Sequence, residues 1–228
     1  MQINGEYLTS AKKLFENRAD AGAKLAALLS EYVNLPVVVL AIPNGGVPLA
    51  MQVAPSLKAQ LDIIICRKLT LPMNPEGGLG ALADDGTSIL NEEVMKNDGI
   101  SPAQIEHEIA QVKKSIRERR LLYRSQALPP RLNGQTAIIV DDGLASGITM
   151  SVAVKAVRHR QPRQVVVAVP LASATGFQRV SQLADKVICC AVAQLKQFFL
   201  ADFYKTWRDV SDREVEHYLE QWRRRQAF

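Results

Sequence analysis

The strongest structural signal in this chain is the run Ala137-Ile138-Ile139-Val140-Asp141-Asp142-Gly143-Leu144-Ala145-Ser146-Gly147-Ile148-Thr149-Met150. Its first four residues predict a buried parallel strand, because such strands carry near-continuous apolar runs. Two aspartates follow, then a turn of small residues, then an apolar stretch that predicts a helix. Ligands of open α/β sheets bind outside the carboxyl ends of strands, and helix N-termini bind anions. The run therefore offers two carboxylates for hydroxyls or a metal ion, beside a cradle for a phosphate.

This run resembles the signature of the type I phosphoribosyltransferases, which bind 5-phosphoribosyl 1-pyrophosphate (PRPP). The resemblance implies that Asp141 and Asp142 hold the ribose hydroxyls and, through them or through water, a magnesium ion. It implies that the following loop holds the 5′-phosphate, mostly through backbone N–H groups. The PRPP-binding residues implied are Asp141, Asp142, Gly143, Ala145, Ser146, Gly147, Ile148 and Thr149. An ordinary strand-to-helix turn with two solvated aspartates is the alternative interpretation.

A second loop, Pro43-Asn44-Gly45-Gly46, follows the apolar run Val37 to Ile42, which predicts another buried strand. Consecutive glycines permit unusual backbone conformations and let a ligand approach the main chain closely. The loop resembles the pyrophosphate loop of the family, in which arginine is usual at the position of Asn44. Asparagine retains hydrogen bonding but loses a positive charge. A plain tight turn is the alternative interpretation.

Two cations, Arg67 and Lys68, end a third predicted strand, Leu61 to Cys66. Cations at this edge of a sheet suit a pyrophosphate leaving group, although a pair of surface cations is the alternative. The following residues 69–86 are rich in glycine and proline and predict a loop. The resemblance, here to adenine-type and orotate-type enzymes, implies a mobile lid. Within it, Glu76 is a candidate proton donor or acceptor to a base, and a solvated glutamate is the alternative.

The rest of the chain alternates strands and helices, which predicts an α/β fold with a mostly parallel sheet flanked by helices. Ser101-Pro102-Ala103-Gln104 and Ser211-Asp212-Arg213-Glu214 are capping boxes that begin two helices. The other predicted helices cover residues 10–32, 48–56 and 149–160, and the other strands cover 87–90, 136–140, 164–169 and 186–192.

The resemblance also implies the domain organisation. It implies one phosphoribosyltransferase domain over residues 1–228, with a Rossmann-like core and a small hood. The hood is expected from the N-terminal segment and residues of about 185–228. Phe203 or Tyr204 would lie there and could stack on a planar base, with ordinary packing as the alternative.

Composition limits the remaining possibilities. The chain has 228 residues, 47% of them apolar, and no apolar run approaches the ~20 residues that span a membrane. Met1 to Ser10 lacks the layout of a secretory signal. Cys66, Cys189 and Cys190 lack metal-ligand spacing and predict buried, reduced thiols in a cytoplasmic protein. The net charge of +5 suits an anionic small substrate and is too weak to indicate a nucleic acid partner.

The function implied by the resemblance is magnesium-dependent transfer of the phosphoribosyl group of PRPP to a nitrogenous base, with release of pyrophosphate. The order of short motifs from Leu61 to Glu92 resembles a bacterial group of stand-alone phosphoribosyltransferase-domain proteins of unassigned substrate. Membership of the wider family implies a role in nucleotide metabolism. Type I relatives are commonly homodimers. In hypoxanthine-guanine relatives, the position of Ala145 holds an aspartate that contacts the purine. The resemblance therefore disfavours this subclass. The alternatives are a sensor of PRPP or a nucleotide without catalysis, and a sugar-phosphate hydrolase, for which no water-activating group is evident.

Overall fold

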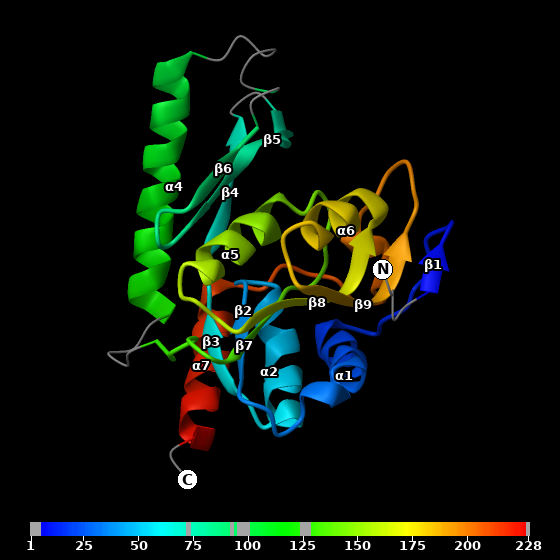
Figure 1. The fold of residues 1–228 in the computed structure, drawn as a ribbon. Helices are drawn as coiled ribbons and strands as arrows, with labels where there is room; N and C mark the ends of the chain where they lie inside the picture. Colours follow the sequence, from blue (N-terminus) through cyan, green and yellow to red (C-terminus); the bar gives the residue numbers. More distant parts are fainter. Residues whose placement is uncertain (1–5, 72–73, 92–93, 95–100, 124–128, 227–228) are drawn as a thin grey trace.

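The computed structural model describes residues 6–71, 74–91, 94, 101–123 and 129–226. A central sheet has the strand order β1-β9-β8-β7-β2-β3, and its neighbouring strands are parallel (Figure 1). The strands are β1 (Glu6–Leu8), β2 (Val37–Ala41), β3 (Gln60–Ile63), β7 (Thr136–Val140), β8 (Gln164–Ser173) and β9 (Lys186–Ala193). The predicted α/β fold with a mostly parallel sheet is confirmed.

Helices cover both faces of this sheet. Helices α1 (Arg18–Leu28) and α2 (Gly46–Leu57) pack on one face, and α5 (Ile148–Arg158) and α6 (Ala174–Ser181) on the other (Figure 1). Alternate residues of a strand point to opposite faces. Thus Val39 and Ile138 join the cluster that contains α1 and α2, while Leu40 and Ile139 join the cluster that contains α5 and α6. Burial on both faces explains why β2 and β7 read as continuous apolar runs.

The order in which the chain adds strands to the sheet reverses between the parallel neighbours β2 and β7. From β2 the chain passes through α2 to β3 on one side, whereas β7, paired with the other edge of β2, leads through β8 to β9 in the opposite direction. Such a switch point leaves a crevice at the carboxyl ends of the two strands. The loops that begin at Ile42 and Asp141 therefore open into the same crevice.

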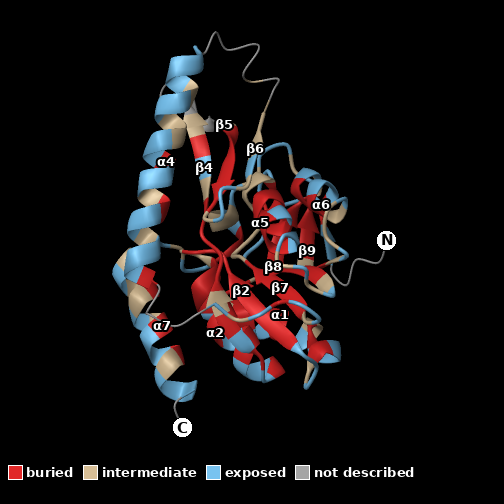
Figure 2. Ribbon diagram, turned by 60° about the vertical axis from the view of Figure 1, so that its left-hand side comes forward, coloured by how far each residue is buried: buried red, intermediate tan, exposed pale blue. Residues whose placement is uncertain are grey.

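A smaller antiparallel sheet stands beside the core, with the order β4 (Cys66–Leu71), β5 (Asn74–Ala83) and β6 (Ser88–Leu90). Helix α4 (Pro102–Tyr123) packs along it, with its outer side exposed (Figure 2). The prediction of a loop over residues 69–86 is therefore wrong. Glycine here serves close strand pairing: at Gly80, with φ of +154°, a Cβ would lie 2.0 Å from the carbonyl oxygen of Ile89. Movement of this segment as a lid stays a prediction.

Several other boundaries differ from the predictions. The first helix begins at Arg18, after the cap Asn17, and not near residue 10, and the 3-10 helix η1 (Ser30–Tyr32) follows it. The predicted strand over residues 61–66 is divided between β3 and β4. Residues 186–193, assigned above to a hood, form β9 of the central sheet instead.

The C-terminal part consists of the 3-10 helix η2 (Leu200–Phe203) and helix α7 (Asp212–Gln226). Both predicted capping boxes are confirmed, since Ser101 Oγ accepts from Gln104 N at 3.3 Å and Ser211 Oγ from Glu214 N at 3.3 Å. Cys66 and Cys189 are buried free thiols, as predicted, and Cys190 is half-buried.

Within the described residues, no helix has both the length and the apolar character that crossing a bilayer would require.

The contact between α1 and α2 yields a first prediction. A Cβ at Gly22 would lie 2.8 Å from Leu49 Cα and 2.9 Å from Leu49 O, both backbone atoms that cannot rotate away. Gly22→Ala should therefore lower the free energy of unfolding by about 1–3 kcal/mol in urea denaturation. The exposed neighbour supplies the control, because Ala23→Ser should change it by less than about 0.5 kcal/mol. Equal stability of the two variants would contradict this packing.

Candidate active site

A cavity of about 640 Å³ lies at the carboxyl ends of β2 and β7. It is lined by the loop after β2, the start of β4, one side of α4, and the loop between β7 and α5. Of the predicted PRPP-binding residues, all except Ile148 line it: Asp141, Asp142, Gly143, Ala145, Ser146, Gly147 and Thr149. The volume is within the range of about 300–1,000 Å³ that is typical of small-molecule sites.

The loop between β7 and α5 is held from behind by β8 and α6. Ser173 Oγ donates to Ala145 O at 2.5 Å, and Arg179 Nη1 donates to Ser146 O at 2.7 Å. Gly147 has φ of +75°, a conformation that favours glycine, and directly precedes α5. The loop thus combines anchored carbonyl groups with the donor end of a helix, which suits a bound phosphate.

Ser173 and Arg179 were missed by the sequence analysis. A local signal exists only for Ser173, which caps α6 by accepting from Gly176 N at 2.9 Å. Nothing local to Arg179 connects it to the loop.

Asp142 is held by an ion pair at the edge of the cavity. Arg18 Nε lies 2.8 Å from Asp142 Oδ2, and the two side chains are only 10% and 13% exposed. The Arg18 guanidinium lies over the Trp207 ring, 3.8 Å from its centroid, which fits a cation–π contact. Tyr204 Oη donates to Asp142 O at 2.8 Å. Burial raises the pKa of Asp142, and Arg18 opposes that rise.

Within the described part of the chain, Asp141 has no such ion pair, and the more distant charges of Arg18 and Lys68 offset the rise in its pKa only in part. Its Oδ1 accepts from Asp142 N at 2.8 Å, and among the described residues no cation lies within 4.0 Å of its carboxylate. Burial and the charge of Asp142 raise the pKa of Asp141 well above its usual range. This half-buried carboxyl group lines the cavity, and hydroxyl donors or a divalent cation bound there would favour its ionised form.

The described residues contain no cluster of three or more His, Cys, Asp or Glu side chains that could enclose a metal ion. The residues present fit a magnesium ion that takes most of its ligands from a substrate and from water. Asp141 and Asp142 are the carboxylates available to it.

The glycines after β2 allow that loop to pass directly against the acidic pair. A Cβ at Gly45 would lie 2.0 Å from Asp142 Oδ2, and one at Gly46 would lie 2.5 Å from Val140 O. The Pro43–Asn44 peptide bond is cis, and Pro43 lines the cavity. Asn44 does not: its side chain is bonded outside the cavity, to residues 210 and 212. The Asn44 side chain therefore does not reach the cavity in this structure, and a contact of residue 44 with pyrophosphate stays a prediction.

Both predicted cations line the cavity, although their setting differs from the expectation. Arg67 and Lys68 belong to the antiparallel strand β4, not to the carboxyl end of a parallel strand. Arg67 is half-buried, and burial together with the neighbouring charge of Arg119 lowers its pKa. Since arginine keeps its proton at any physiological pH, the cavity retains a cationic wall opposite the phosphate loop.

The predicted base-stacking residues lie elsewhere. Phe203 and Tyr204 are fully buried and do not line the cavity, so their role is packing. The Tyr204 ring packs between Phe15 and Trp207 in tilted contacts, at ring-centroid distances of 5.2 Å and 4.9 Å. The backbone of Glu76 belongs to β5, and its side chain lies outside the described part of the structure.

Helix α4 adds a polar wall that the sequence analysis missed. Glu108, Gln111 and Ser115 recur at helical spacing and line the cavity, while Val112 and Ile116 are buried. Glu108 Oε1 accepts from Thr70 N at 3.3 Å. In the sequence, Ile105, Ile109, Val112 and Ile116 recur at three- and four-residue spacing and predict the apolar side of this helix, but nothing local indicates which polar side would meet the cavity.

Comparison with known proteins agrees with this geometry. The family model described as "Phosphoribosyl transferase domain" matches residues 10–204. Two curated proteins from Mycobacterium tuberculosis, strains CDC 1551 and H37Rv, are provisionally named phosphoribosyl transferases; each is 36% identical over 91% of this chain and 47% of its own length. The chain thus spans about half the length of these relatives. The crystal structure of TT1426 from Thermus thermophilus is 34% identical, with a TM-score of 0.74, over 92% of this chain and 99% of that one.

The raised pKa of Asp141 predicts a pH-dependent stability. Because its folded-state pKa is raised, ionising it in the folded protein costs free energy that Asp141→Asn removes. The gain should be absent below about pH 3.9, grow as the pH rises to the folded-state pKa, and stay constant above it. Thermal melts should show a higher Tm at neutral pH, by about 2–4 °C per kcal/mol. The exposed Asp202→Asn is the control, and a pH-independent difference would contradict the assignment.

Proposed function

Because the chain belongs to the phosphoribosyl transferase family, whose members are transferases of the pentosyltransferase type, we propose that it transfers the 5-phosphoribosyl group of PRPP to a nitrogenous base. Pyrophosphate is the leaving group, and the reaction depends on magnesium. One observation carries the proposal: Asp141, the anchored phosphate loop and the cations Arg67 and Lys68 line the same cavity. These groups match the ribose hydroxyls, the 5′-phosphate and the pyrophosphate of PRPP.

The reaction forms a bond between the anomeric carbon and a nitrogen of the base, and breaks the bond from that carbon to pyrophosphate. Such glycosyl transfers pass through oxocarbenium-like transition states. Arg67 and Lys68 stabilise the charge that develops on the departing pyrophosphate. The loop of residues 143–147 fixes the 5′-phosphate, and Asp141 accepts hydrogen bonds from the ribose hydroxyls, so the anomeric carbon is held in position.

The chemistry that a bound magnesium ion would supply is neutralisation of part of the pyrophosphate charge. Asp141 is the carboxylate best placed to hold such an ion through the ribose hydroxyls or water. Asp142, already paired with Arg18, keeps the acidic pair in place.

Other parts of the proposal rest on the resemblance to the family. The β4–β5 hairpin closes over the substrates and excludes water, which would compete with the base as nucleophile. Glu76 is the candidate for proton exchange with the base. The protein is a homodimer that acts in nucleotide metabolism in the cytoplasm.

Titration calorimetry with PRPP tests the binding step without knowledge of the acceptor. The wild type should bind PRPP more tightly with magnesium than without it. Asp141→Asn should weaken this binding by about 10- to 150-fold, because a hydrogen bond to a charged group contributes about 1.5–3 kcal/mol. Asp202→Asn, outside the cavity, should bind as the wild type does. A folded wild type that does not bind PRPP would refute the proposal.

Turnover distinguishes an enzyme from a sensor of PRPP. With a panel of purine and pyrimidine bases, pyrophosphate release should identify an acceptor, and Arg67→Gln should lower kcat by about 10²–10³-fold, comparable to the loss of an oxyanion donor. Lys155→Gln, which removes an exposed cation of α5 that does not line this cavity, is the control. Magnesium-dependent PRPP binding without turnover on any base would favour the sensor.

A further inference from the structure

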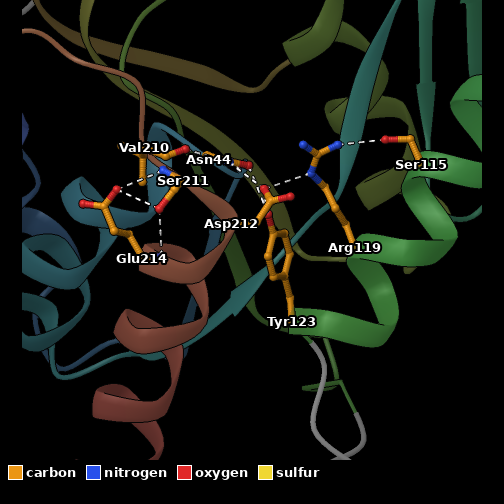
Figure 3. A network of polar contacts seen from close by, with 8 residues as sticks. All are labelled: Asn44, Ser115, Arg119, Tyr123, Val210, Ser211, Asp212 and Glu214. Carbon is orange, nitrogen blue, oxygen red and sulfur yellow. Dashed lines mark hydrogen bonds and ion pairs between the residues drawn. The ribbon is translucent and has the colours of Figure 1, made fainter.

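The Asn44 side chain joins the loop after β2 to the start of α7. Its Nδ2 donates to Val210 O at 2.8 Å and to Asp212 Oδ1 at 2.8 Å (Figure 3). Residue 44 lies between Pro43, which lines the cavity, and Gly45, which passes against Asp142. A group that fixes the Asn44 side chain therefore fixes the backbone of the loop at the cavity.

Helix α4 reaches the same carboxylate. Tyr123 Oη lies 2.5 Å from Asp212 Oδ1 and 3.2 Å from Asn44 Oδ1, and Arg119 Nε donates to Asp212 Oδ1 at 3.2 Å (Figure 3). One carboxylate oxygen thus accepts from groups on two walls of the cavity. Hydrogen bonds to an ionised acceptor are stronger than neutral ones, so this oxygen is well suited to join them.

The protonation states keep the network intact over a wide pH range. Burial raises the pKa of Tyr123, and its contact with Asp212 adds to that rise, so the hydroxyl remains a donor. Burial disfavours the ionised form of Asp212, but hydrogen bonds from Tyr123 and Asn44 and the charge of Arg119 outweigh it and lower the pKa. Asp212 is therefore a carboxylate at neutral pH.

Arg119 extends the network to the cavity wall. Its Nη1 donates to Ser115 Oγ at 2.8 Å, and Ser115 lines the cavity (Figure 3). Arg119 also lies close enough to Arg67 to lower the pKa of that residue. Asp212 itself does not line the cavity, so any effect it has on a ligand acts through these neighbours.

We propose that Asp212 and Tyr123 are positioning residues that hold the pyrophosphate loop, through Asn44, at a fixed distance from the polar wall of α4, through Arg119 and Ser115. The inference rests on the proposed function, because the ligand it concerns is the pyrophosphate of PRPP. In this chain the Asn44 side chain supports the loop structurally. We call the contacts among Asn44, Asp212, Tyr123 and Arg119 the joint. Loss of the joint lets the loop and α4 separate and misplaces the groups that would bind pyrophosphate.

Two variants test the joint. Tyr123→Phe removes one hydroxyl and keeps the buried ring, and Asp212→Ala removes the shared acceptor. Magnesium–PRPP titration should show a Kd about 5- to 20-fold higher than that of the wild type for both variants, the size of effect expected when contacting groups are coupled. Asp212→Asn, which keeps an acceptor oxygen, should lose less affinity than Asp212→Ala.

The control is Ser211→Ala, which removes the cap of the same helix without touching Asn44, Tyr123 or Arg119. It should lower stability but leave the Kd for PRPP unchanged. Hydrogen exchange of the peptide covering residues 42–47 should be faster in Tyr123→Phe than in Ser211→Ala, which a general loss of stability would not produce.

The outcomes separate the two claims. If the wild type binds magnesium–PRPP and the folded variants bind it equally well, the positioning role is refuted and the proposed function stands. Unchanged exchange at residues 42–47 in Tyr123→Phe also refutes the joint. If the wild type does not bind PRPP at all, the proposed function fails, and the role of the joint in PRPP binding fails with it.

Discussion

Among the described residues, one cation, Arg18, lies within ion-pair distance of the two adjacent carboxylates at the end of β7, and this imbalance governs the candidate site. Arg18 neutralises Asp142 at 2.8 Å in a nearly buried pair, while burial and the charge of Asp142 raise the pKa of Asp141. A buried charge without a partner is costly, and a ligand that supplies hydroxyl donors or a cation relieves the cost. Arg18 belongs to α1, so the ion pair connects α1 to the site. The Trp207 ring, which contacts the Arg18 guanidinium, connects the segment before α7 to the site as well. Segments from both ends of the chain therefore determine the charge state of the site.

Close approach of the two loops is the second constraint. Neighbouring parallel strands β2 and β7 place their loops so near each other that Gly45 and Gly46 have no space for a Cβ. The neighbouring Asn44 side chain donates to Val210 O and to Asp212 Oδ1. The carboxylate of Asp212 also accepts from Arg119 of α4. The geometry of the cavity thus depends on an element that does not line it.

Local patterns predicted the parts of the fold that depend on local physics. The run from Ala137 to Met150 contains its own strand, loop and helix start, and both capping boxes are satisfied within four residues. Contacts between distant segments were not predictable in this way. The Asn44 side chain forms hydrogen bonds with Tyr123 and Asp212, which are separated from it by 79 and 168 positions in the sequence. Arg18 pairs with Asp142, at a separation of 124 positions. The β4–β5 hairpin was predicted as a loop because it is rich in glycine. In the structure these glycines allow close strand pairing, which the sequence alone does not reveal. Aromatic character likewise could not tell whether Phe203 and Tyr204 stack on a ligand or pack in the core.

The charge asymmetry of the acidic pair can be tested by a crystal structure of the complex with magnesium and PRPP. We expect a ribose hydroxyl within hydrogen-bond distance of Asp141, the 5′-phosphate in the loop of residues 143–147, and an intact Arg18–Asp142 pair. A ligand bound outside this cavity, or a ribose held by Asp142 after its release from Arg18 while Asp141 makes no contact, would contradict this expectation.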